Sequence, residues 1–275
     1  MIHLLLPGPL HLLGCGNMAG AMLHGWLDAG LPPEQVTVTR PSGAFVAEGV
    51  RVLTAPPEGE TAHILLLGMK PQRLEEAAPA AEKLIGPETL VVSILAGTEL
   101  ATLRAHFPAA RLIVRAMPNT PVALRVGVTN LIAEAGARDA DVEALMAALG
   151  HVEWFQDEEL FALAGHLSAA APAFLYRFIA ALAGAGATLG LPPEQSARLA
   201  AAMAQGAATL AATSGESPDE LARRVASPGG TTEAGLKVLD ENGALAKLML
   251  ETLDASRRRG LEMAQAARQS LSRSE

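Results

Sequence analysis

The chain has 275 residues, half of them apolar and 18% charged, which is enough apolar material for one large domain or two ordinary ones and argues against a disordered protein. Its net charge of −8 provides no basic surface to neutralise phosphates, so we expect no nucleic-acid partner. The single cysteine, Cys15, excludes an internal disulfide and fits a reducing, cytoplasmic compartment.

In residues 1–158, short apolar runs alternate with helical patterns. We expect strands at Leu10–Leu13, Val36–Arg40, Ile64–Leu67, Leu90–Ile94, Arg111–Arg115, Val126–Ala133 and His151–Phe155. Helices are expected between them at Met18–Ala29, Gln72–Ile85, Glu99–Phe107 and Ala140–Leu149. Strands without polar alternation are typical of a sheet buried on both faces. The alternation predicts an α/β fold with a doubly wound, Rossmann-like and mostly parallel sheet.

In residues 159–275, strand patterns are absent and the sequence predicts a separate helical domain. Helices are expected at Glu158–His166, Pro172–Gly190, Pro193–Ser214, Pro218–Ala226, Thr232–Asn242 and Ala244–Arg268. The stretch Phe174–Leu189 is apolar nearly all round, so it must be buried on every side. We expect oligomerisation through this helix, the alternative being a central helix of a monomeric bundle. Over the longer apolar stretch Phe174–Leu191, Arg177 and the glycines at 184, 186 and 190 disfavour a membrane span, and no membrane partner is expected.

A glycine-rich turn follows the first predicted strand, with the sequence Gly14-Cys15-Gly16-Asn17-Met18-Ala19. This G-x-G-x-x-A pattern between a strand and a helix is typical of dinucleotide binding. Gly14 permits the tight turn, Gly16 lets the pyrophosphate approach the backbone, and Ala19 allows close packing of helix and strand. The free N–H groups near Met18 then bind the pyrophosphate. Cys15 is interpreted as a small turn residue, although a reactive thiol remains an alternative.

The end of the second strand indicates which dinucleotide is bound. NAD-binding domains place an acid there for the ribose hydroxyls, but no acid occurs from Gln35 to Ala47. Arg40 can pair with a 2′-phosphate and Ser42 can donate a hydrogen bond to it. The sequence therefore favours NADP, with NADPH preferred and NADH an alternative. The competing interpretation of Arg40 is a solvated loop charge.

Two further turns follow predicted strands, where ligands bind in open α/β sheets. The first contains Met69, Lys70 and Pro71, and the second contains Asn119. The Asn119 amide is a candidate partner of the cofactor's carboxamide or ribose, or it forms an Asx turn. Lys70 either contacts the cofactor or is ordinary surface charge.

In the helical half, Ser227-Pro228-Gly229-Gly230-Thr231-Thr232 leads into a helix. Free N–H groups at a helix start suit a carboxylate, and two glycines allow a substrate to approach closely. A plain capped helix start explains the same residues.

Three segments resemble the pyrroline-5-carboxylate reductase family: Met69-Lys70-Pro71-Gln72, Arg115-Ala116-Met117-Pro118-Asn119-Thr120-Pro121, and Ser227–Thr232. The resemblance implies a Rossmann-like NADP-binding domain over 1–158 and a helical dimerisation and substrate domain over 159–275, with dimers that assemble further in some members. It implies reduction of 1-pyrroline-5-carboxylate to L-proline, the last step of proline biosynthesis. The implied catalytic residues are Thr232, beside the ring nitrogen, and Ser227. The implied substrate-binding residues are Val225, Pro228, Gly229, Gly230 and Thr231.

The chain departs from the family pattern where "SGSGPA" is usual. It carries Ser168-Ala169-Ala170-Ala171-Pro172-Ala173 instead, and Ala162, Gly165 and Arg224 also replace residues common in the family. These changes cluster on the expected substrate side. Two other functions therefore stay open: reduction of a different cyclic imine carboxylate, or a catalytically silent NADP-binding oligomer.

Overall fold

The computed structural model describes residues 4–271, with side chains described as far as residue 263. The chain divides into two compact units. One comprises the described residues up to Ala170 together with those from Gly260 onward, and the other is Ala171–Arg259. The contacts thus group the first helix of the predicted helical domain with the sheet. The predicted division of roles at residue 158 stays a prediction.

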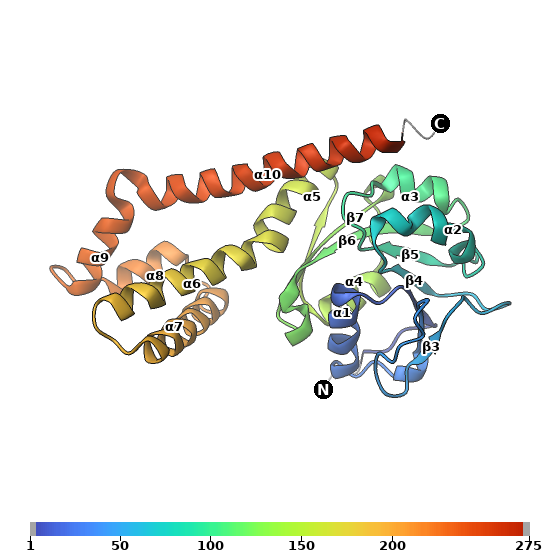
Figure 1. Ribbon diagram of the computed structural model, residues 1–275, viewed down its shortest axis with the longest axis horizontal. Coiled ribbons are helices and arrows are strands. Elements are labelled where there is room, and N and C mark those ends of the chain that lie inside the picture. Colours follow the sequence, from blue (N-terminus) through green and yellow to red (C-terminus); the bar gives the residue numbers. More distant parts are fainter. Residues whose placement is uncertain (1–3, 272–275) are drawn as a thin grey trace. The chain divides into compact units, whose positions relative to one another are not determined.

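An eight-stranded sheet forms the first unit, with strand order β3-β2-β1-β4-β5-β6-β7-β8 (Figure 1). Its strands are β1 Leu10–Leu13, β2 Val36–Thr39, β3 Arg51–Leu53, β4 Ile64–Leu67, β5 Leu90–Ser93, β6 Leu112–Pro118, β7 Gly127–Ala133 and β8 Gly150–Phe155. All neighbours are parallel except β6 and β7. The predicted doubly wound, mostly parallel fold is confirmed. Strand β3 was not predicted, because its three residues are partly exposed and form no apolar run.

Helices cover both faces of this sheet. The helices are α1 Asn17–Asp28, α2 Leu74–Glu82, α3 Leu100–His106 and α4 Ala140–Ala147, with short 3₁₀ turns at Pro33–Gln35, Pro71–Arg73, Thr120–Leu124 and Glu134–Gly136. Along β4, Ile64 and Leu66 pack with residues of α1 and α4, whereas Leu65 and Leu67 pack with residues of α2 and α3. Figure 1 shows α2 and α3 together on one side of the strands. Burial on both faces explains why these strands are continuously apolar.

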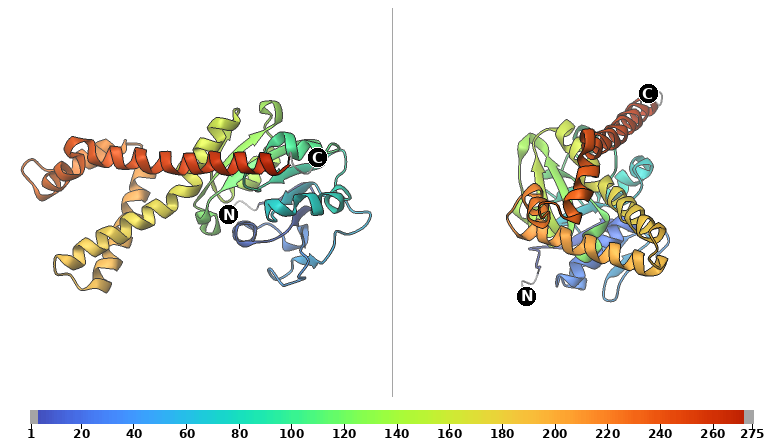
Figure 2. Two further views of the ribbon diagram at one scale, coloured as in Figure 1. Left: turned by 45° about the horizontal axis from the view of Figure 1, so that its top comes forward. Right: turned by 90° about the vertical axis from the view of Figure 1, so that its left-hand side faces the viewer.

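From Glu158 to Leu271 the chain is helical, as predicted. It contains α5 Glu158–Gly165, a π-helical turn His166–Ala170, α6 Ala171–Thr188, α7 Pro193–Thr213, α8 Pro218–Val225, α9 Thr231–Asp240, a 3₁₀ turn Glu241–Gly243 and α10 Ala244–Leu271. Helices α6 and α7, drawn in yellow and orange in Figure 2, pack against each other. The Ser196 hydroxyl donates a hydrogen bond of 2.7 Å to the Ala183 carbonyl and so ties the two helices together.

Helix α6 presents a large apolar surface. The run Glu158–Thr188 is long and apolar enough to cross a membrane by length and composition alone, with a mean hydropathy of 1.4 over its best 18-residue window, none of which is buried. The large exposed apolar residues of α6 and α7 are Leu175, Tyr176, Phe178, Leu182, Leu199, Met203 and Leu210. An apolar surface that continues over two helices marks an interaction site rather than a solvated face.

A buried histidine gives the sheet unit a specific sensitivity to acid. His11 on β1 is 4% exposed and lies 2.8 Å from the Thr39 hydroxyl on β2. Burial lowers the pKa of His11 to about 4. Two nearby charges have smaller effects: Glu60 raises this pKa and Arg51 lowers it. In the unfolded chain the pKa of His11 returns to about 6.5. Between pH 6.5 and 4, the unfolded state therefore binds a proton that the folded state does not bind.

Because of His11, we therefore expect the free energy of unfolding to fall by up to about 3 kcal/mol as the pH falls from 6.5 to 4. The scale is about 1.4 kcal/mol per unit of pKa shift. His11→Gln, which can still bond Thr39, removes this part of the acid sensitivity. Urea unfolding of both proteins at pH 7 and pH 4.5 measures the difference. His24→Gln is the matched control, because His24 is exposed and that variant should follow the parent. An equal acid loss in His11→Gln and the parent would contradict the assignment.

Candidate active site

The ends of β1 and β4 meet at the point where the strand order reverses, and their backbones touch there. Gly14 has a φ of +85°, and a Cβ on it would lie 2.8 Å from the Met69 amide nitrogen. A Cβ on Gly68 would lie 2.7 Å from the Gly14 carbonyl oxygen and 2.8 Å from the Ala19 Cβ. Only glycine fits at either position. The contact brings together three predicted cofactor residues, Gly14, Ala19 and Met69, at the edge where open α/β sheets bind ligands.

The N-terminus of α1 is open to an anion. Its N-cap residue, Gly16, has no side chain to bond the first-turn N–H groups. Gly16 and Asn17 are exposed and Met18 is half-buried. The nearest atom to a Cβ on Gly16 is the Gly68 carbonyl oxygen at 3.9 Å, so the approach is clear. These residues fit the pyrophosphate of a dinucleotide, which would take the free N–H groups and the positive end of the helix.

Arg40 and Ser42 follow β2 beside this turn. The Arg40 amide donates to the Leu53 carbonyl at 2.9 Å, which fixes the backbone, while the side chain is half-buried and forms no ion pair with any described residue. Burial raises the pKa of the Cys15 thiol, and the nearby Arg40 charge opposes that effect. Cys15 is therefore a protonated thiol, and the positive charge of Arg40 is close enough to act on it. Ser42 is exposed and accepts a hydrogen bond from the Ala44 amide at 3.3 Å.

Lys70 and Pro71 form the turn after β4. Lys70 precedes the 3₁₀ turn that Pro71 begins, and its side chain is exposed and outside the ion pairs of the described chain. The turn is thus stiffened by proline at the same sheet edge as the glycine turn. Contact of Lys70 or Pro71 with a cofactor stays a prediction.

Asn119 is engaged within the protein. Its Oδ1 accepts from the Val128 amide at 2.8 Å, and its Nδ2 donates to the Ser168 carbonyl at 3.0 Å. Asn130 on β7 donates to the Ser168 hydroxyl at 2.8 Å, and that hydroxyl donates to the Ala164 carbonyl at 2.9 Å. Asn119 therefore holds the end of β6 against β7 and the π-helical turn. One N–H of its amide is left for a ligand, so the predicted cofactor contact stays a prediction.

Arg115, part of the motif that ends β6, has a structural role that the sequence did not reveal. Its guanidinium lies 2.8 Å from the Glu158 carboxylate and 4.9 Å from the centre of the Phe161 ring. The second oxygen of Glu158 accepts from the Leu100 amide at the start of α3, at 3.1 Å. Burial lowers the pKa of Arg115, and the Glu158 charge opposes this effect. The pair of buried Arg115 and half-buried Glu158 thus fixes α5 to both β6 and α3.

In the helical unit, Ser227–Gly230 form the loop between α8 and α9, which we call the SPGG loop. Gly229 has a φ of +68°, which favours glycine, and the Gly230 amide donates to the Ser227 carbonyl at 2.9 Å. The N-cap of α9 is Gly230, without a side-chain cap, so first-turn N–H groups are available for an anion.

The predicted substrate residues all lie on this loop or beside it. Ser227, Pro228, Gly229 and Thr231 are exposed, Gly230 and Thr232 are half-buried, and Val225 ends α8 with 65% of its surface exposed. Glu233, which the sequence did not point to, accepts from the Gly229 amide at 2.7 Å. An acid at the third helical position is one half of a capping box, but Gly230 occupies the N-cap in place of Ser or Thr, so the Ser/Thr-x-x-Glu signature is incomplete here.

No group of three His, Cys, Asp or Glu side chains lies close enough to hold a metal ion among the residues that the structure describes. The features that could carry chemistry are the uncapped starts of α1 and α9 and the hydroxyls of Ser227 and Thr232.

Comparisons with known proteins match two parts of the chain to two different family models. Residues 9–97 match the family model described as NADP oxidoreductase coenzyme F420-dependent, and residues 158–263 match that of pyrroline-5-carboxylate reductase dimerisation. The chain is 36% identical over 262 residues to the pyrroline-5-carboxylate reductase of Pseudomonas aeruginosa, covering 92% of this chain and 96% of that protein. It is 33% identical over 241 residues to the Escherichia coli enzyme of the same name, covering 84% and 89%.

Solved structures give the same result. A pyrroline-5-carboxylate reductase from Coxiella burnetii superposes with a TM-score of 0.85 and 31% identity, covering 94% of this chain and 98% of that one. The Plasmodium falciparum pyrroline carboxylate reductase, solved with NADP bound, has the same fold with a TM-score of 0.78, at 22% identity and the same coverage. The chain belongs to the pyrroline-5-carboxylate reductase family of NAD(P)-dependent oxidoreductases.

Proposed function

We propose that this protein reduces 1-pyrroline-5-carboxylate to L-proline, the last step of proline biosynthesis, by hydride transfer from NADPH. The observation that carries the proposal is the pair of open helix starts: the glycine turn before α1 suits a dinucleotide pyrophosphate, and the SPGG loop before α9 suits a small carboxylate. The relatives of the same family carry the name of this reaction.

At the cofactor end, the chain's task is binding and orientation. When bound, the reduced nicotinamide supplies the hydride. Gly14, Gly16, Asn17, Met18 and Ala19 hold the pyrophosphate. Arg40 and Ser42 take the 2′-phosphate, which makes NADPH the preferred cofactor over NADH, because a guanidinium pairs with a phosphate and no acid nearby repels it. Met69, Lys70, Pro71 and Asn119 line the sheet edge next to the bound cofactor.

At the substrate end, the chain binds a carboxylate and supports a ring nitrogen. The N–H groups at the start of α9, with Gly229 and Gly230, bind the substrate carboxylate, while Val225, Pro228 and Thr231 shape the pocket around the ring. The Thr232 hydroxyl bonds the ring nitrogen and the Ser227 hydroxyl assists. A protonated cyclic imine is already electrophilic, so no strong base is required, which fits a site built from hydroxyls and amides.

The protein acts as a homodimer in the cytoplasm. The exposed apolar residues of α6 and α7 are the surface that a second chain would bury, in the region that matches the dimerisation model. Residues 1–158 then bind NADP, and residues 159–275 dimerise and bind substrate. Sedimentation equilibrium checks the subunit count, and the mass of one chain would contradict this assignment.

A second candidate function is reduction of another cyclic imine carboxylate. Ala169 and Ala170 end the π-helical turn and Ala171 begins α6, where the family usually has two glycines and a serine. Added methyl groups reduce the room beside a ligand, and π-helical turns are common at functional sites. Substrate profiling with five- and six-membered cyclic imine carboxylates separates the two functions.

The first test is loss of NADPH absorbance when purified protein is mixed with 1-pyrroline-5-carboxylate, run beside NADH. We expect rapid oxidation of NADPH, slower oxidation of NADH and formation of proline. NADPH that binds but is not oxidised by any cyclic imine carboxylate would contradict both candidate functions and favour a catalytically silent NADP-binding protein.

Arg40→Asp should shift the cofactor preference towards NADH. Loss of a charge-assisted bond to the 2′-phosphate corresponds to roughly 1.5–3 kcal/mol, or about 10- to 100-fold in kcat/KM for NADPH. The measurement is the ratio of kcat/KM for the two cofactors. Lys83→Asp makes the same charge change at an exposed site after α2 and should keep the parent's ratio. A parental ratio in Arg40→Asp would refute the role of Arg40.

Thr232→Ala should lower kcat by about 10- to 100-fold, on the scale of a lost transition-state hydrogen bond of roughly 1–3 kcal/mol. The KM for NADPH should stay near the parent's, because the hydroxyl acts on the ring nitrogen and not on the cofactor. Thr232→Ser keeps a hydroxyl and should recover most of the activity. Thr232 has no part in the mechanism if steady-state kinetics of the alanine variant match those of the parent.

A further inference from the structure

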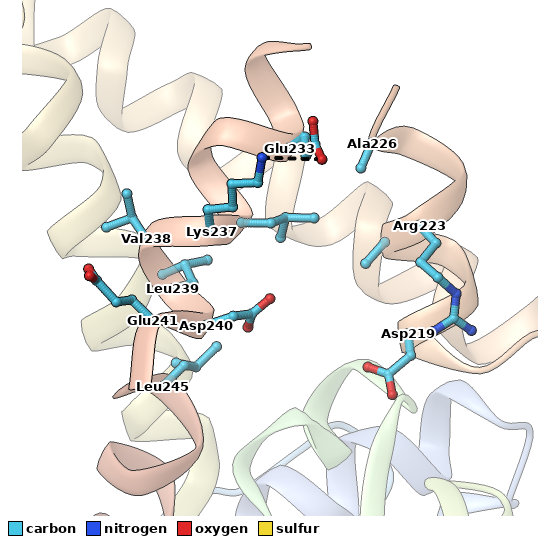
Figure 3. Close-up of a pocket in the computed structure, with 12 residues that line it drawn as sticks. Asp219, Arg223, Ala226, Glu233, Lys237, Val238, Leu239, Asp240, Glu241 and Leu245 are labelled. Carbon is cyan, nitrogen blue, oxygen red and sulfur yellow. Dashed lines mark ion pairs between the residues drawn. The ribbon is translucent and has the colours of Figure 1, made fainter. Parts of the chain in front are cut away.

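A carboxylate of the protein itself is bonded to the SPGG loop. Glu233 is the third residue of α9, and its Oε2 accepts from the Gly229 amide at 2.7 Å. Its Oε1 lies 3.3 Å from Lys237 Nζ, one helical turn further along. Figure 3 shows the two side chains directed at one another, joined by the dashed line of their ion pair.

This carboxylate lies at the helix N-terminus that is proposed to bind the substrate. A negative side chain in the first turn is stabilised by the helix dipole, and its bond to Gly229 holds that residue in its left-handed conformation. A substrate carboxylate bound to the neighbouring N–H groups would be a second negative charge at the same helix end. Like charges this close repel and weaken the binding of the incoming anion.

The surroundings make the charge of Lys237 important. Glu233 and Lys237 line a hollow of about 960 Å³ together with charged residues of α8 and of the segment that ends α9. These other charged residues are Asp219, Arg223, Asp240 and Glu241. The hollow thus holds four carboxylates and two cations, and Lys237 is the cation paired with Glu233 (Figure 3).

We propose that Glu233 and Lys237 form a charge pair that sets how tightly the SPGG loop binds carboxylate substrates. This proposal rests on the proposed function of that loop. Glu233 fixes the loop conformation and, by its charge, weakens binding of the substrate anion. Lys237, whose side chain is 73% exposed, offsets part of that charge. The pair therefore determines the KM for the carboxylate substrate and leaves hydride transfer unaffected.

Two single substitutions should shift the KM for 1-pyrroline-5-carboxylate in opposite directions. Glu233→Gln keeps an oxygen that accepts from the Gly229 amide and removes the charge, so the KM should fall about three- to tenfold. Lys237→Met keeps the aliphatic stem and leaves Glu233 uncompensated, so the KM should rise about three- to tenfold. In both variants kcat and the KM for NADPH should stay within about twofold of the parent, and added salt should shrink both shifts.

Two controls restrict the interpretation to this pair. Glu194→Gln makes the same charge change on α7, where the side chain is 95% exposed, and should leave the KM unchanged. The neutral carboxamide analogue of the substrate should have the same KM with the parent and with Glu233→Gln, because it adds no second negative charge.

Shifts in the same direction, or no shift in either variant, would overturn the inference. The Thr232→Ala variant separates this failure from failure of the proposed function. If Thr232→Ala lowers kcat but the charge variants leave the KM unchanged, the loop binds substrate and the pair does not set its affinity. If Thr232→Ala is also without effect, the SPGG loop is not the substrate site.

Discussion

Contact between the backbones of Gly14 and Gly68 is the constraint on which the sheet unit depends. The two strands that precede these glycines are central neighbours in the sheet, and their ends approach closely enough that no side chain fits between them. The same approach brings α1 into position through Ala19 and leaves its first-turn N–H groups open. The same close approach therefore determines both the packing of the sheet and the position of the anion-binding groups at the start of α1. A methyl group at either glycine would disturb both.

Polar contacts add to the burial of Phe161 in fixing the segment that leaves the sheet. The Arg115–Glu158 pair holds the beginning of α5, and the bonds from Asn119 and Asn130 to Ser168 hold the turn that follows it. All of these groups are buried or half-buried, so each is costly unless it is paired. Directional bonds specify one arrangement where apolar side chains alone would permit several. This explains why the motif around β6 combines an arginine and an asparagine that have separate structural roles.

The sequence predicts the strands and helices well where an apolar pattern is bounded by glycine or proline. β1 and β4 have the expected bounds because a short, mostly apolar run ends at a glycine in each case. β3 escapes prediction because its pairing with β2 comes from tertiary context rather than from its own residues. In the site, the glycine turn and the SPGG loop are readable because glycines and prolines mark them. The internal bonds of Asn119 and the return of Glu233 to Gly229 depend on how the chain folds back, which spacing alone does not reveal.

The uncovered apolar face of α6 and α7 has a consequence for how the protein responds to dilution. Side chains such as Phe178 and Leu182 contribute the free energy of burial only when a second chain covers them. Part of the stability of the helical unit is then governed by mass action, and the unfolding temperature should rise with protein concentration. Because the SPGG loop, the proposed substrate site, belongs to the same unit, its ordering would be coupled to the assembly of the chains. A higher concentration of this protein in the cell would thereby raise the fraction of chains that are assembled and active.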